Sequence, residues 1–202
     1  MIESLHALLD PQTLIKTLGT IGVIAIVFAE TGFFFGFFLP GDSLLFMAGF
    51  LATQGYTSMV GLLIGAFIAA VIGDSLGYAF GKKVGPSIFT KEDSIFFNKQ
   101  HIARAQHFYE KHGKKTIVLA RFMPIIRTFA PIVAGIGAMN YKTFLTFNII
   151  GGFAWTWILL WLGYSLGALI PNPDRFVLPI VIVIVIVSSA PALREIFRKR
   201  HV

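Results

Sequence analysis

Cysteine is absent from this 202-residue sequence, and charged side chains are scarce. Without cysteine the chain has no disulfide, no thiolate nucleophile and no Cys-ligated metal site. Charged residues make up 13% of the sequence, whereas soluble domains carry roughly a quarter. Hydrophobic residues make up 55% and include 21 Phe. This composition predicts a protein that resides in lipid.

The net charge of +7 does not indicate a nucleic-acid partner. The basic residues gather at the ends of apolar runs, where positive charge fixes the orientation of a membrane protein. The five histidines show no metal-ligand spacing such as HExxH. We therefore expect no metal and no other cofactor. No basic segment precedes the first apolar run, so we expect that run to be retained rather than cleaved as a signal peptide.

The apolar runs fall into two classes by length. A membrane-spanning helix needs about 20 apolar residues. Two runs, near 31–54 and 116–139, are broken at Pro40 and Pro124 into halves too short to cross. Each is predicted to be a helical hairpin that enters and leaves on the same side. The predicted fold class is an all-α integral membrane protein with one membrane domain, and its spanning helices lie near 14–30, 58–80, 143–170 and 176–194.

Two strongly basic stretches predict the orientation. The segment 82–115 holds eight Lys or Arg residues, and the chain ends in Arg198-Lys199-Arg200. Basic loops stay on the cytoplasmic side. With the predicted spans, both termini then lie in the cytoplasm.

An internal repeat appears when the sequence is shifted by 86 residues. Residues 47–81 and 133–167 then match without gaps at 12 of 35 positions, with Gly49 on Gly135 and Tyr78 on Tyr164. We predict repeat 1 at about 31–81 and repeat 2 at about 116–167. Each unit is a hairpin plus one span, so it crosses the membrane once and the second copy is inverted. Inverted repeats with broken helices place their site near the midplane, between the repeats.

Four charged residues flank the two predicted breaks. Charge at membrane depth is costly unless it is paired or hydrated, so such residues are functional candidates. Arg121 and Arg127 bracket Pro124, and their planar forks suit phosphate oxygens. Glu30 and Asp42 flank the other break; we predict that they pair with the arginines and take up protons. Three alternatives stay open here: Glu30 as an interfacial residue, Asp42 as a helix N-cap, and ion pairing of the arginines with these acids for structure alone.

The broken backbone at membrane depth has a further consequence. Such backbone is tolerated only against protein or a water-filled cavity, and we predict a hydrated cavity around the four charges. Asp74 lies inside the run 58–80. It is predicted either to pair with Lys82 or Lys83 at the basic loop or to support the site.

Several short motifs occur together along the chain. The first motifs are Glu30-Thr31-Gly32 and Phe38-Leu39-Pro40-Gly41-Asp42. A second pattern is Gly73-Asp74-x-x-Gly77-Tyr78-x-x-Gly81. The third is Arg121-Phe122-Met123-Pro124-Ile125-Ile126-Arg127, followed by Ala134-Gly135. Together these motifs resemble the DedA family, also described as the SNARE-associated or VTT-domain family, and the resemblance covers residues from about 28 to 167.

The resemblance implies a bacterial inner-membrane protein with two opposed re-entrant hairpins. It also implies transport that depends on the proton motive force. Some members translocate undecaprenyl phosphate and others move phospholipids. The family's essential acids map onto Glu30 and Asp42, and its essential arginines onto Arg121 and Arg127. Asp74, Tyr78, Pro40, Pro124 and Gly135 fall in the same motifs and are predicted to support the site.

These features predict a proton-coupled flippase for a lipid carrier, most simply undecaprenyl phosphate, rather than an enzyme. Its partners would be membrane lipids, a polyprenyl phosphate and protons, and a homodimer is compatible with the pattern. Three alternatives stay open: a phospholipid scramblase without proton coupling, a transporter of small ions or solutes, and a lipid phosphatase. The phosphatase would need a nucleophilic His or Ser, and no His lies in an apolar segment.

Overall fold

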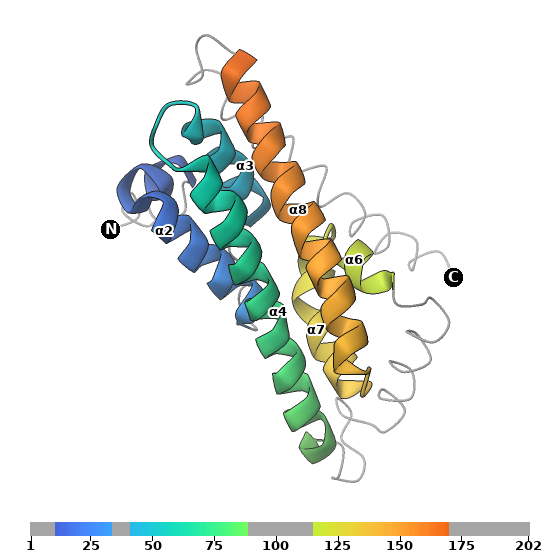
Figure 1. Cartoon of the computed structure of the whole chain (residues 1–202). Coiled ribbons are helices and arrows are strands. Elements are labelled where there is room, and N and C mark those ends of the chain that lie inside the picture. Colours follow the sequence, from blue (N-terminus) through green and yellow to red (C-terminus); the bar gives the residue numbers. More distant parts are fainter. Residues whose placement is uncertain (1–10, 34–40, 89–114, 170–202) are drawn as a thin grey trace, which may run out of the picture.

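The computed structural model describes residues 11–33, 41–88 and 115–169. Within these ranges all regular structure is helical, which confirms the predicted all-α class. Pro40, residues 89–114 and the predicted helix 176–194 lie outside the described residues. The helices, shown in Figure 1, are α2 (Pro11–Gly32), α3 (Gly41–Ala52), α4 (Met59–Ile88), α6 (Thr116–Ala120), α7 (Pro124–Ile136) and α8 (Tyr141–Leu169).

The two longest helices, α4 and α8, run antiparallel and form the spine of the molecule (Figure 1). Helices α2 and α3 lie toward one end of this pair, and α6 and α7 lie toward the other. Among the described residues, three segments are long and apolar enough to cross a membrane by length and composition: Ile15–Gly32, Met59–Val84 and Tyr141–Leu169. They correspond to the spans predicted near 14–30, 58–80 and 143–170.

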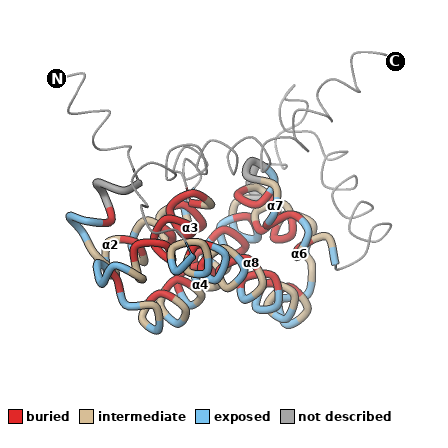
Figure 2. The backbone as a smooth tube through the Cα atoms, turned by 90° about the horizontal axis from the view of Figure 1, so that it is seen from above, coloured by how far each residue is buried: buried red, intermediate tan, exposed pale blue. Residues whose placement is uncertain are grey.

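An apolar stripe covers the outer side of α4. Its members are spaced four residues apart, so they share one face of the helix. All of them are about half exposed, which suits a surface in contact with lipid tails. They are Ile64, Ile68, Ile72, Leu76 and Phe80. In Figure 2 exposed and buried colours accordingly alternate around the long helices.

The short helices pack in a crossed pattern. Helix α3 packs on α8, whereas α7 packs on α4. Both contacts depend on glycine, because a Cβ at Gly49 would overlap the backbone of Leu160, and a Cβ at Gly135 would overlap that of Tyr78. Gly49 and Gly135 are equivalent under the 86-residue shift. The two halves of the described chain therefore hold each other through matching close approaches.

The chain breaks between α6 and α7. Helix α6 ends at Ala120 with Arg121 as its C-cap, and Met123 is extended at φ −119° and ψ 106°. Pro124 then opens α7, at a position where a missing N–H is not needed for the helix. This break, which the sequence predicted at Pro124, places one arginine before it and another after it.

Candidate functional site

Arg127 joins the ends of two other helices. It is the fourth residue of α7, while Glu30 lies in the last turn of α2 and Asp42 is the second residue of α3. One terminal nitrogen of the guanidinium, Nη2, donates to Glu30 Oε1, and the other, Nη1, donates to Asp42 Oδ1. Each arm of the planar fork therefore holds a different carboxylate. The prediction that Arg127 pairs with Glu30 and Asp42 is confirmed.

This ion-pair cluster is buried. Glu30 is 0% exposed and Arg127 is 7% exposed. The Glu30 carboxylate lies against the first residue of α3, where a Cβ on Gly41 would overlap it. A side chain at residue 41 would therefore displace the Glu30 carboxylate. Buried charges are tolerated when partners with good geometry compensate for the lost hydration, and here the three side chains compensate one another.

Trp155 of α8 contacts both Arg127 and Asp42. Its indole Nε1 donates to Asp42 Oδ1 at 2.8 Å. The guanidinium carbon of Arg127 lies 4.8 Å from the centre of the indole ring, which is within range of a cation–π interaction. The sequence did not single out this tryptophan. The only signal was the repeat, in which Trp155 falls on the small, buried Ala69.

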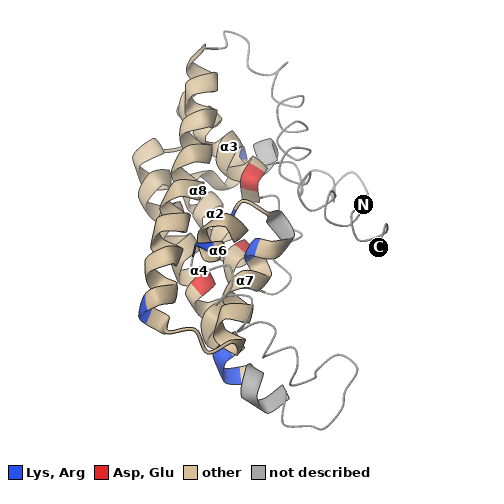
Figure 3. Ribbon diagram, turned by 90° about the vertical axis from the view of Figure 1, so that its right-hand side faces the viewer, with Lys and Arg blue, Asp and Glu red and all other residues tan. Residues whose placement is uncertain are grey.

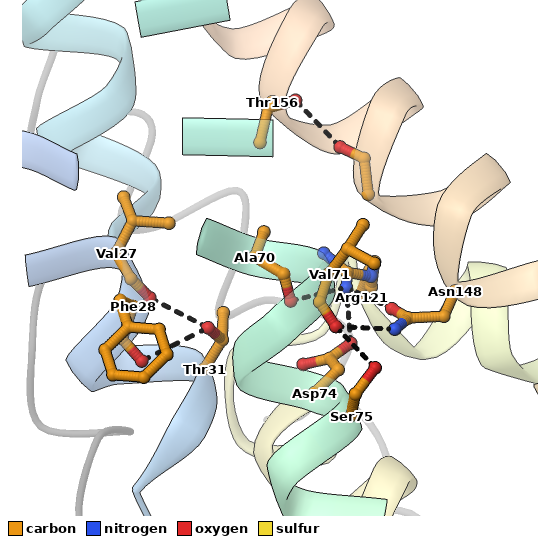
Figure 4. Close-up of polar contacts among 11 residues, drawn as sticks. Val27, Phe28, Thr31, Ala70, Val71, Asp74, Ser75, Arg121, Asn148 and Thr156 are labelled. Carbon is orange, nitrogen blue, oxygen red and sulfur yellow. Dashed lines mark hydrogen bonds and ion pairs between the residues drawn. The ribbon is translucent and has the colours of Figure 1, made fainter. Parts of the chain in front are cut away.

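Arg121 lies in a second cluster, shown in Figure 4. It donates to the Asp74 carboxylate, to Asn148 Oδ1 and, at 3.2 Å, to the Ala70 carbonyl. The Asn148 amide nitrogen donates in turn to the Val71 carbonyl at 3.0 Å. Arg121 is 3% exposed, Asp74 is 4% exposed and Asn148 is 0% exposed. The cluster thus ties α6 and α8 to the middle of α4.

The pairing in this second cluster differs from the sequence prediction. Arg121 was expected to pair with Glu30 and Asp42, but its carboxylate partner is Asp74. Asp74 is bound there rather than to Lys82 or Lys83, which are exposed further along α4. The packing of α6 on α8 places Arg121 over this part of α4. The hydrophobic pattern of a single helix does not predict this placement, because it depends on how distant helices pack together.

Both clusters are buried, and the hydrated cavity that the sequence predicted around them stays a prediction. In the described structure the charges are packed in protein, and even Asp42, the most accessible, has a side chain only 13% exposed. Membrane-depth charge and broken backbone are tolerated against protein as well as against water. Figure 3 shows the acidic and basic residues of the described chain as a few separate patches among uncharged residues.

Acidic residues lie at one helix break and arginines lie at the other. The two acids of the first cluster end α2 and begin α3, while the two arginines end α6 and begin α7. Acids therefore flank one helix break and bases flank the other, and the first cluster forms where the two breaks meet.

Two of the predicted supporting residues connect α4 and α7. The Tyr78 hydroxyl donates to the Met139 carbonyl just beyond α7, and Gly135 packs on the Tyr78 backbone. Neither residue is bonded to the charged clusters by these contacts. The structure thus places them as packing elements that hold α7, and with it Arg127, against α4.

Three apolar helices of spanning length around buried ion pairs define a helical membrane protein. Residues 39–165 match the model of the VTT domain. The chain belongs to this family, the DedA family, which confirms the resemblance seen in the motifs.

Named relatives support the same assignment. Protein DedA of Escherichia coli strain K12 is 41% identical over 87% of this chain and 81% of its own length. An uncharacterized membrane protein of Mycobacterium leprae is 42% identical over 84% of this chain and 76% of its own. Inner membrane protein YqjA of Escherichia coli K12 is 32% identical over 72% of this chain and 66% of its own. No solved structure matches the chain.

Proposed function

We propose that this protein is a proton-coupled transporter that carries the phosphate head group of a lipid carrier across the bacterial inner membrane. Undecaprenyl phosphate is the substrate that the family resemblance favours. One observation carries the proposal: Arg127 is buried, and its fork is divided between the carboxylates of Glu30 and Asp42. A guanidinium held in this way is an anion site occupied by the protein's own carboxylates.

In the proposed cycle, carboxylate and phosphate oxygens exchange places at the Arg127 guanidinium. Phosphate oxygens accept the same charge-assisted, paired hydrogen bonds as carboxylates. When protons neutralise Glu30 and Asp42, the charge that holds Arg127 is lost and the guanidinium is free to bind phosphate. When the protons leave, the carboxylates reclaim Arg127 and expel the phosphate. Proton movement and head-group movement are coupled because they compete for one cation.

The membrane arrangement that fits this cycle is an inverted repeat. Helices α3 and α7 are apolar but too short to span, and each packs on the long helix of the other half. We propose that they are limbs of re-entrant hairpins that enter from opposite leaflets, with both termini cytoplasmic. The meeting of Arg127 with Glu30 and Asp42 supports such an approach of the two breaks.

The lipid tail would stay outside the protein. The long helices carry half-exposed apolar side chains on their outer sides, including Ile72 and Leu76 on α4 and Ile158 and Leu162 on α8. Such surfaces offer a polyprenyl tail the same environment as lipid. Only the phosphate then needs to pass the buried charges, which reduces the cost of crossing to that of one head group.

A flipping assay in liposomes tests the proposal. The purified protein is reconstituted in phosphatidylcholine vesicles containing a labelled polyprenyl phosphate, with and without a pH gradient. We expect Arg127→Ala to abolish flipping of the labelled lipid. Lys142→Ala is the matched control, because Lys142 is an exposed cation outside both clusters and its loss should leave the rate unchanged. Parental rates in Arg127→Ala would overturn the proposal.

The same vesicles separate the proposal from its alternatives. A scramblase would flip phosphatidylcholine without a gradient and would tolerate Glu30→Gln. A small-ion transporter would dissipate a pH gradient in vesicles that contain no polyprenyl phosphate. The proposed carrier needs both the gradient and the phosphate head group, so neither result is expected from it.

A further inference from the structure

One face of α8 contacts both ion-pair clusters. Asn148 accepts a hydrogen bond from Arg121, and Trp155 contacts Arg127 and Asp42. These two α8 residues are seven positions apart, which is close to two turns, so their side chains share one side of the helix. A single rigid element therefore provides an uncharged polar partner to each buried arginine.

Two glycines lie between these residues and make room for Arg121. A Cβ on Gly151 would lie 3.0 Å from Arg121 Cδ, and a Cβ on Gly152 would lie 3.4 Å from its Cζ. Larger side chains at these positions would push the guanidinium away from α8. The face formed by Asn148, Gly151, Gly152 and Trp155, here called the α8 inner face, is thus shaped around the arginines.

The other repeat lacks this polar face. Under the 86-residue shift, the α8 inner face corresponds to apolar or small residues of α4. Three of these are buried in a hydrophobic cluster that also contains residues of α2. They are Leu62, Ala66 and Ala69. Asparagine and tryptophan are therefore particular to α8, where they meet charge.

We propose that Asn148 and Trp155 are positioning residues that couple the two ion pairs, so that displacement of α8 loosens both arginines together. Asn148 orients Arg121 toward Asp74, and Trp155 holds Asp42 and Arg127 in contact. If α8 shifts relative to α3 and α4, both sets of contacts break in one step. The role in transport depends on the proposed function, but the coupling itself is a property of the resting protein.

Tryptophan fluorescence tests the coupling without any substrate. The protein has three Trp residues, and Trp157→Phe with Trp161→Phe leaves Trp155 as the only one. The two replaced rings contact other aromatic side chains, Phe153 and Tyr164, and are not bonded to the clusters. Emission and acrylamide quenching of this variant in detergent then report the surroundings of Trp155 alone.

The decisive variant alters the cluster around Arg121, while the spectrum reports on Trp155 in the cluster around Arg127. Asn148→Leu, added to the single-Trp variant, removes the amide that holds Arg121. We expect the Trp155 emission to shift to longer wavelength and its quenching by acrylamide to increase. Ile149→Ala is the matched control, because the neighbouring Ile149 is 42% exposed on the outer side, and it should leave the spectrum unchanged. If Asn148→Leu does not fold, Asn148→Ala removes the amide without adding bulk.

An unchanged Trp155 spectrum in the folded Asn148 variant would overturn the inference, and so would an equal shift in Ile149→Ala.

The proposed function is tested separately by lipid flipping. In that assay Trp155→Phe keeps an aromatic ring, smaller than the indole, but loses the N–H bond to Asp42. We expect a lower KM for the labelled polyprenyl phosphate, because Arg127 is released more easily, and a lower kcat, because the pair re-forms less readily. If the parent protein flips no lipid but the Asn148 substitution still shifts the Trp155 spectrum, the transport proposal is rejected and the coupling of the two ion pairs stands.

Discussion

Asp74 in the middle of α4 is the carboxylate partner of Arg121, 47 residues further along the chain. Both side chains are buried, with 3% of the Arg121 side chain and 6% of the Asp74 side chain exposed. Asp74 is thus a third acid in the described clusters, beside the buried Glu30 and the partly buried Asp42. The described clusters hold three carboxylates and two guanidinium groups, so a proton or an additional cation would balance them.

Removing one partner of this pair should cost more stability than removing both. Asp74→Leu leaves Arg121 as an unpaired buried charge, for which we expect a loss of about 3–5 kcal/mol. The double variant Asp74→Leu with Arg121→Met should recover much of that loss, because no charge is left without a partner. Unfolding in detergent by chemical denaturant measures the difference. Equal losses in the single and double variants would mean that the pair does not interact.

Arg127→Lys should fail to replace Arg127. Lysine keeps the positive charge but is a point charge on a flexible stem, and it cannot present two parallel donors to two carboxylates or to a phosphate. We expect binding of the polyprenyl phosphate to weaken roughly 10-fold or more, equivalent to about 1.4 kcal/mol. Titration of the purified variant with the lipid measures this, and parental affinity would contradict the fork geometry.

Gly41→Ala should disrupt the first cluster selectively. Its methyl group would overlap the Glu30 carboxylate, so either Glu30 leaves Arg127 or α3 moves away. Gly77→Ala is the matched control, because a Cβ there meets only ordinary contacts at 3.4 Å and 3.6 Å. We expect flipping to be lost in the first variant and retained in the second. Equal activity of the two would show that α3 is not held tightly at Glu30.

Proton coupling predicts a pH dependence that Glu30→Gln removes. In the proposed cycle protons enter where they neutralise Glu30 and Asp42, so flipping should rise as the pH falls on the side from which phosphate is loaded. A glutamine cannot gain or lose the proton, and its variant should show a flatter pH profile. The measurement is the initial flipping rate across a pH series. An unchanged slope in Glu30→Gln would remove Glu30 from the proton path.

Tyr78→Phe should weaken the protein without stopping transport. The variant loses only the hydroxyl bond to the Met139 carbonyl, and such a hydrogen bond contributes about 0.5–1.5 kcal/mol. We expect a lower unfolding midpoint in detergent and a flipping rate close to that of the parent. A large loss of flipping at parental stability would instead place Tyr78 in the transport site.

Much of the architecture follows from local features of the chain. Apolar runs of spanning length predicted α2, α4 and α8, because a bilayer accepts only helices of that kind here. Pro124 marked the start of α7 after the break, since proline is favoured in the first turn of a helix, where its missing N–H is not needed. Charge inside apolar runs marked Glu30, Asp42, Arg121 and Arg127 as candidates, because a charge at membrane depth is costly unless it is paired or hydrated.

The pairing of these charges was decided by tertiary packing. Arg127 meets acids 97 and 85 residues away, and no periodicity along one helix encodes which partner a distant side chain will face. The α6–α8 contact carried Arg121 to Asp74 instead of Glu30. Asn148 and Trp155 entered the site for the same reason: an uncharged residue in a span is unremarkable until the folded chain sets it against a buried charge.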